Sequence, residues 1–226
     1  MNFNKKSLKA LALSTTLFFA GISPVQAVAM HYNEESIAVD TVVQINPTTI
    51  ELRLRDNRYL VIDFYGEDIF RMFQDNHGGI VRDPQPMEGY PDAQILVENP
   101  RREVSNLTIN ESEDSYTIGT AKIEITVCKS SGTIKVKNLA TGKIAFEEAV
   151  PGLFKDTKTT ITLKSSEGEF FYGGGVQNGR FSHAGKAIDI ENQSSWTDGG
   201  VASPTPFFWS TNGYGFMWHT FKKGKY

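Results

Sequence analysis

The stretch KIEITVCKSSGTIKVKN, residues 122–138, decides the fold class. Apolar and polar side chains alternate on both sides of Ser130-Ser131-Gly132, and the apolar ones are Ile123, Ile125, Val127, Ile134 and Val136. A period of two residues puts one face of a β-strand on a core and the other in water. Ser and Gly between two such runs are typical of a turn. The stretch therefore predicts two neighbouring antiparallel strands.

The same period recurs along most of the chain. It is found in residues 50–55 and 160–164, and Asn212-Gly213 lies between two aromatic-rich runs. Asn-Gly between such runs is a strong β-hairpin signal. No long segment has the 3.6-residue period of a helix. Several short strands at close spacing predict an all-β fold, an antiparallel β-sandwich that spans residues 28–226.

Composition excludes several classes of protein. The 226 residues have a formal net charge of −3, which argues against sequence-independent binding of nucleic acid. The single cysteine, Cys128, rules out an intramolecular disulfide and zinc sites built on several cysteines. The four histidines lack metal-ligand spacing, so we expect neither a metal site nor a cofactor.

Residues 1–27 have the layout of a secretory signal peptide. Lys5, Lys6 and Lys9 precede the apolar run Ala10–Ile22, and small residues stand at the −3 and −1 positions of Val25-Gln26-Ala27. The run is short for a membrane span, which needs about 20 residues, although an N-terminal anchor is the alternative. We expect cleavage after Ala27, export, and no membrane contact after cleavage.

The segment FYGGGVQNGRF, residues 171–181, is the strongest candidate for a binding loop. Three glycines precede Gln177 and Asn178, whose amides can donate to and accept from sugar hydroxyls. Downstream, Trp196 offers a ring on which a pyranose can stack, and Asp198 offers a hydroxyl contact. We predict a sugar-binding site at these four residues. The alternative is that the amides satisfy turn backbone and that the aromatic residues are core.

No catalytic residue is assigned from the sequence. Asp189 and Glu191 would share one side of an extended segment. The two carboxyl groups of a retaining glycosidase instead face each other across a cleft, about 5–5.5 Å apart. His183 and His219 have no motif that would supply them with triad or metal partners.

Three segments together resemble the N-terminal domain of glycoside hydrolase family 31: FYGGGVQNGRF, the Trp196 loop, and SPTPFFWSTNGYGFMWHTF at residues 203–221. The resemblance covers residues 38–226. It implies a galactose-mutarotase-like β-sandwich that packs against a (β/α)8 barrel, and the family's catalytic aspartates lie on that barrel. The version of the motif at Gln177–Phe181 is similar to exported bacterial members that act on α-linked galactose-type or N-acetylgalactosamine sugars.

From this resemblance we expect the chain to be truncated before the catalytic barrel and to be inactive alone. Its carbohydrate partner would be an α-linked glycoside or glycan, held by a loop at residues 173–200 in the barrel's pocket. A stand-alone carbohydrate-binding or structural sandwich is the alternative. A mutarotase-like epimerase is a further one, and it would need a His–Glu pair across a sheet face.

Overall fold

The computed structural model describes residues 37–75, 104–155, 158–177, 181–191, 201–218 and 223–226. The chain divides into two units, residues 1–31 and 32–226. The described residues all belong to the second unit, and the proposed signal peptide lies outside them. No helix among them has the length and apolar character that crossing a membrane requires.

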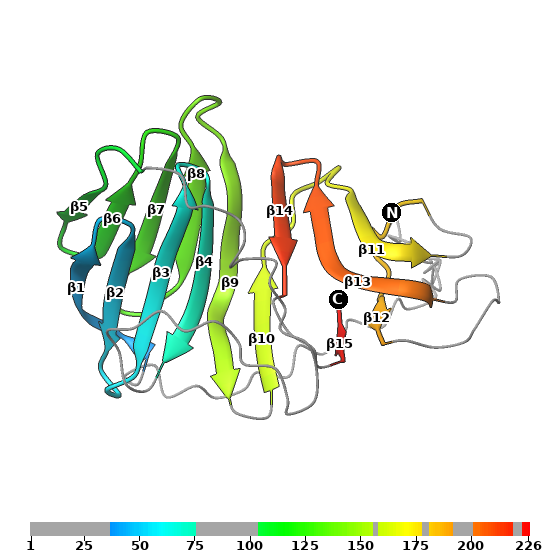
Figure 1. The fold of residues 1–226 in the computed structure, drawn as a ribbon, viewed down its shortest axis with the longest axis horizontal. Helices are drawn as coiled ribbons and strands as arrows, with labels where there is room; N and C mark the ends of the chain where they lie inside the picture. Colours follow the sequence, from blue (N-terminus) through cyan, green and yellow to red (C-terminus); the bar gives the residue numbers. More distant parts are fainter. Residues whose placement is uncertain (1–36, 76–103, 156–157, 178–180, 192–200, 219–222) are drawn as a thin grey trace, which may run out of the picture. The chain divides into compact units, whose positions relative to one another are not determined.

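Two antiparallel sheets make up the first part of this unit (Figure 1). The smaller sheet has the order β1-β2-β3-β4, with strands Val39–Asn46, Thr49–Leu54, Tyr59–Gly66 and Ile69–Asp75. The larger has the order β10-β9-β8-β7-β6-β5, with strands Lys158–Leu163, Ile144–Lys155, Ile134–Asn138, Ile123–Cys128, Ser115–Gly119 and Thr108–Glu111. The strands predicted in residues 122–138 are confirmed as β7 and β8, and the alternation at residues 50–55 forms β2.

The predicted alternation places the core between these two sheets. Ile125 and Val127 of β7 are fully buried, and so are Ile50 and Leu52 of β2. These side chains belong to one cluster of buried residues, whose other members are Val39, Leu54, Leu60, Ile62, Phe64, Tyr116, Ile118, Ile123, Ile134 and Val136. Burying each large aliphatic side chain stabilises the fold by about 1.5–3 kcal/mol. The predicted all-β sandwich is therefore confirmed.

Strand β3 is buried on both faces, so a polar side chain within it needs partners. Asp63 is fully buried. Its carboxylate accepts a hydrogen bond from the Thr49 hydroxyl at 3.0 Å and lies 3.6 Å from Nη2 of Arg71. A buried carboxylate is tolerated when it is paired in this way.

The turn between β3 and β4 fastens the two sheets together. The Glu67 carboxylate accepts hydrogen bonds from the Ser105 amide at 2.7 Å, the Ser105 hydroxyl at 2.8 Å and the Ala121 amide at 2.8 Å. The Thr120 hydroxyl donates to the Glu67 carbonyl. These contacts join the turn of one sheet to the β6–β7 turn of the other and to the segment that enters β5.

Two smaller sheets follow. The order β11-β13-β14 joins Phe171–Gln177, Val201–Ser210 and Tyr214–Met217, and β12 (Asp189–Ile190) pairs with β15 (Gly224–Lys225). The predicted Asn212-Gly213 hairpin connects β13 to β14. Its loop has three residues, because Ser210 pairs with Tyr214, and Gly213 adopts a φ of 87° that favours glycine.

Candidate functional site

Three glycines of β11 lie opposite extra residues of β13, at an irregularity in the pairing that we call the glycine bulge. Gly173, Gly174 and Gly175 have φ values of 109°, 73° and 85°. A Cβ atom on Gly173 would lie 2.7 Å from the Phe207 carbonyl oxygen. Glycine is needed at this position because the chain must combine a positive φ with a close approach to β13.

The bulge interrupts the pairing of β11 with β13 shortly before β11 ends. Gly173 is opposite Phe208 and Gly175 is opposite Pro204, so β13 has more residues than β11 between these two pairs. After the bulge, Gln177 pairs with Val201. The chain therefore leaves β11 and enters β13 at one end of this sheet.

The predicted sugar-contacting residues begin at that end. The backbone of Gln177 closes β11, while its side chain lies outside what the structure describes. Asn178, Trp196 and Asp198 also lie outside the described residues. The site at these four residues therefore stays a prediction.

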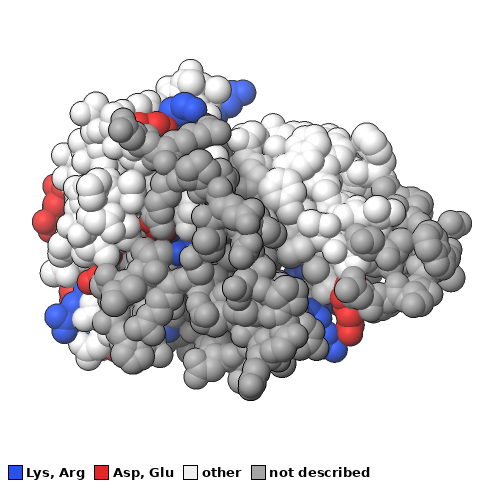
Figure 2. Space-filling model, in the orientation of Figure 1, with Lys and Arg blue, Asp and Glu red and all other residues white. Residues whose placement is uncertain are grey.

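Apolar side chains gather on one face of the β11-β13-β14 sheet. Phe207 and Trp209 alternate along β13 and are 40% and 46% exposed. Trp209 stacks on Tyr172 with ring centroids 4.5 Å apart, and Tyr172 meets the ring of Phe181 edge-on. With Met217, opposite Phe207, these residues form what we call the aromatic face. In Figure 2 the surface over β13 and β14 carries neither Lys and Arg nor Asp and Glu.

The opposite face of the same sheet is a packed aromatic cluster. The Phe208 ring lies between Phe171, Phe216 and Tyr226, with centroids 5.0–5.9 Å away. Tyr214 links this cluster to Phe146 of β9. The aromatic residues are thus divided: the rings of this cluster are half-buried against one another, and most of those on the aromatic face are exposed.

Sequence reasoning missed a buried carboxylate beneath the β13–β14 hairpin. Glu169 accepts hydrogen bonds from the Ser166 amide at 2.9 Å and from the Ser210 hydroxyl. Burial, and then the neighbouring Glu169 charge, raise the pKa of Tyr214. Glu169 follows Glu167-Gly168, which reads as an exposed turn, so no pattern singles it out. Its contacts hold the hairpin in place.

The two acidic residues near β12 are paired with lysines. Asp189 lies 3.1 Å from the Lys225 ammonium, and Glu191 lies 3.5 Å from that of Lys223. All four side chains are exposed, so neither carboxylate is held in an enclosed site. This arrangement ties β12 to β15. Within the described ranges, no group of three or more His, Cys, Asp or Glu residues could hold a metal ion.

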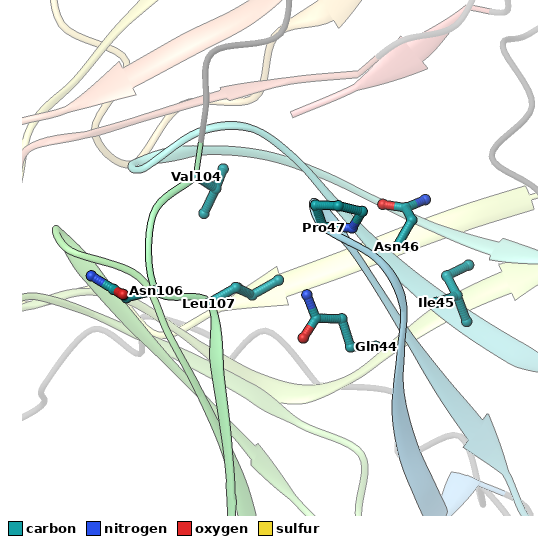
Figure 3. Close-up of a pocket in the computed structure, with 7 residues that line it drawn as sticks. All are labelled: Gln44, Ile45, Asn46, Pro47, Val104, Asn106 and Leu107. Atoms are coloured by element: carbon teal, nitrogen blue, oxygen red, sulfur yellow. The ribbon is translucent and has the colours of Figure 1, made fainter.

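An open hollow lies at the β1–β2 turn (Figure 3). Its volume is about 470 Å3, and its lining residues are Gln44, Ile45, Asn46, Pro47, Val104, Asn106 and Leu107. The Asn46 side-chain oxygen accepts from both the amide and the hydroxyl of Thr48, so it serves the turn.

Comparisons with known proteins agree with this architecture. Residues 59–226 match the family model described as the glycosyl hydrolase 31 N-terminal galactose mutarotase-like domain. No curated protein matches the sequence.

Solved structures supply the same fold at low sequence identity. The GH31 dextranase of Flavobacterium johnsoniae, complexed with glucose, is 16% identical with a TM-score of 0.71, over 84% of this chain and 23% of its own. The cycloalternan-forming enzyme of Listeria monocytogenes is 20% identical with a TM-score of 0.58, and the match covers 79% of this chain and 17% of that enzyme. A GH31 α-xylosidase from a soil metagenome is 19% identical with a TM-score of 0.60, and the match covers 82% of this chain and 29% of that enzyme. The chain therefore spans less than a third of the length of each of these enzymes.

Proposed function

This chain belongs to glycosyl hydrolase family 31 as an N-terminal galactose mutarotase-like domain, and on that premise we propose that it is the N-terminal sandwich of an exported, retaining α-glycosidase. The observation that carries the proposal is the glycine bulge of β11. After the bulge, Gln177 pairs with Val201 at the end of the sheet, where the predicted sugar-contacting residues begin. In this role the domain helps to hold a sugar while another part of the enzyme cleaves it.

The cleavage itself would use two carboxyl groups outside these 226 residues. In a retaining mechanism one carboxylate attacks the anomeric carbon while the other, as an acid, protonates the leaving oxygen, and water then displaces the enzyme from the sugar. Asp189 and Glu191 are poor candidates because each is exposed and bound to a lysine. We assign both carboxyl groups to a (β/α)8 barrel, at the carboxyl ends of its strands.

The aromatic face is the surface that we assign to contact with that barrel. Monomeric proteins seldom expose a contiguous apolar patch of this kind without a partner. The part of this chain that matches each relative of known structure makes up only 23% to 29% of that relative, so these enzymes have further protein available to cover such a face. Phe207, Trp209 and Met217 would lie at the centre of the contact.

The substrate class that we propose is an α-linked glycoside or glycan. Gln177 and Asn178 would bind its hydroxyl groups, Trp196 would stack on a ring, and Asp198 would accept a hydroxyl hydrogen bond. The enzymes of similar structure include a dextranase and an α-xylosidase. The finer proposal, a galactose-type or N-acetylgalactosamine sugar, rests on the sequence of residues 177–181 alone.

An activity assay on two proteins tests this function. One is the 226-residue chain, and the other is the same chain continued through the remainder of its gene's reading frame. We expect aryl α-glycosides to be hydrolysed by the longer protein only. The matched variants Asp189→Asn and Glu191→Gln should leave that activity within about twofold, because each removes only an exposed ion pair.

Two results would contradict the proposal. Hydrolysis by the 226-residue chain that disappears in either variant would place catalysis in this domain. A reading frame without strand–helix repeats beyond residue 226, together with binding of sugar by the chain alone, would favour the stand-alone carbohydrate-binding module.

A further inference from the structure

His183 lies along the open edge of β11. Its backbone amide donates to the Phe171 carbonyl at 2.8 Å, and its ring Nε2 lies 2.9 Å from the Gly173 carbonyl oxygen. Carbonyls two residues apart on a strand point to the same edge. The other edge of β11 pairs with β13. His183 thus donates to this edge twice, from its backbone amide and from its ring.

The bulge needs such a constraint. Glycine loses more conformational freedom on folding than any other residue, and three stand here in succession. The register between β11 and β13 is interrupted between Gly173 and Gly175, so fewer ladder hydrogen bonds hold the bulge from that side. The Gly173–His183 contact falls at this interruption, where it fixes the orientation of one peptide group.

The hydrogen bond to Gly173 also defines which nitrogen of the His183 ring acts as the donor. The Gly173 carbonyl can only accept, so Nε2 carries the proton in this contact. His183 is 7% exposed, and its Nδ1 is buried with no hydrogen-bond partner among the described residues. The contact therefore requires a donor at Nε2, and an apolar side chain of the same size lacks it.

We propose that His183 is a positioning residue: its Nε2–H fixes the Gly173–Gly175 bulge and thereby the direction in which Gln177 leaves the sheet. The effect on sugar binding rests on the proposed function, whereas the fixing of the bulge does not. Neither composition nor motif spacing assigns this role, because the partner of the ring is a backbone carbonyl.

Two substitutions separate the hydrogen bond from the bulk of the ring. His183→Gln keeps an N–H donor at a reach similar to Nε2, while His183→Asn places its donor one bond shorter. Hydrogen exchange of peptides from β11 (residues 171–177) and from β7 (residues 123–128) is measured in both variants of the 226-residue chain. We expect about tenfold faster exchange in β11 for Asn, near wild-type exchange for Gln, and unchanged exchange in β7 in both.

Equal exchange in β11 for the two variants would overturn the proposal, and so would a matching acceleration in β7, which would mean general destabilisation. The same variants in the longer, active protein test the link to sugar. His183→Asn should raise KM with little change in kcat, and Gln should restore it. Altered exchange with an unchanged KM would keep the positioning role but contradict the assignment of sugar contact to the loop at residues 173–200.

Discussion

Glu148 is a carboxyl group buried within the six-stranded sheet. It is 4% exposed and accepts a hydrogen bond from the Ile134 amide at 2.8 Å. Burial raises the pKa of Glu148 from 4.5 to about 7, although the bond from Ile134 acts in the opposite direction. The folded protein therefore holds this proton more tightly than the unfolded chain does.

The sign of the pH dependence follows from this shift. Below pH 4.5 the carboxyl group is protonated in both states, and between pH 4.5 and about 7 only the unfolded chain releases the proton. The free energy of unfolding that this group contributes is thus lost as pH rises through that window, and the loss amounts to at most about 3 kcal/mol. We predict that Glu148→Gln is more stable than wild type at pH 8 by up to this amount and equally stable at pH 4.

Urea unfolding at the two pH values measures the difference. The matched control is Glu147→Gln, which removes the exposed ion pair with Lys164 and should change stability by less than about 1 kcal/mol. A Glu148→Gln variant that is less stable than wild type at pH 8 would show that the charged form is favoured in the folded protein.

Gly173 and Gly142 separate backbone strain from steric conflict. Both have a positive φ, but a Cβ atom on Gly142 would meet no atom within 4 Å, whereas one on Gly173 would lie 2.7 Å from backbone. Gly142→Ala should cost about 1–2 kcal/mol, from the left-handed backbone alone. Gly173→Ala should cost about 3 kcal/mol or more, because β13 must also move. Thermal unfolding of both variants tests this, and equal losses would contradict the tight approach of β11 to β13.

At the scale of elements, the Glu67 turn joins the two sheets of the sandwich. Burial alone would raise the pKa of Glu67, but hydrogen bonds from Ala121 and Ser105 outweigh it and lower the pKa below 4.5. A lowered pKa means that this contribution to stability is present above pH 4.5 and is lost as pH falls through the folded value.

We predict that Glu67→Gln destabilises the protein by about 1 kcal/mol at pH 7, because one of the amide donors then faces an NH2 group. The difference in stability between Glu67→Gln and the wild type should become smaller at acidic pH. Asp68→Asn is the control, since that carboxylate only forms an exposed ion pair with Lys122 and should contribute little. Chemical unfolding at pH 7 and pH 3 measures both variants, and a Glu67→Gln effect no larger than that of Asp68→Asn would mean that the turn does not fasten the sheets.

The elements also differ in how far the sequence could predict them. The strands β2, β7 and β8 follow from alternation because each has one face on the core. The run Gly173–Gly175 indicates a backbone with a wide choice of φ and ψ angles. It does not predict the bulge, because the bulge depends on the close approach of Phe207, which lies on a strand distant in the sequence. The burial of Glu148 and Glu169 could not be predicted from the sequence either, because it depends on neighbours far away in the sequence.

At the scale of the whole molecule, export is the property nearest to a direct test. The three lysines before Ala10–Ile22 and the small residues Val25 and Ala27 predict cleavage after Ala27. N-terminal sequencing of protein collected outside the producing cells should begin at Val28. Protein that retains Met1 in the membrane fraction would identify the segment as an anchor.

The fold of the whole domain was predictable, while the site was predictable only in part. Periodicity gave an all-β sandwich, and the motif at residues 171–181 led to the family. Asn178, Trp196 and Asp198 lie outside the described residues, so their role stays a prediction. The aromatic face could not be separated from core by sequence, because Phe207 and Phe208 are chemically alike and differ only in the side of β13 to which they point.

The stereochemistry of cleavage tests the central claim most directly. Proton NMR should follow an α-linked aryl glycoside as the protein encoded by the whole reading frame hydrolyses it. The account predicts that the α anomer of the sugar forms first and then equilibrates, because two displacements restore the starting configuration. First formation of the β anomer, or the absence of any hydrolysis, would contradict the assignment of this domain to a retaining α-glycosidase.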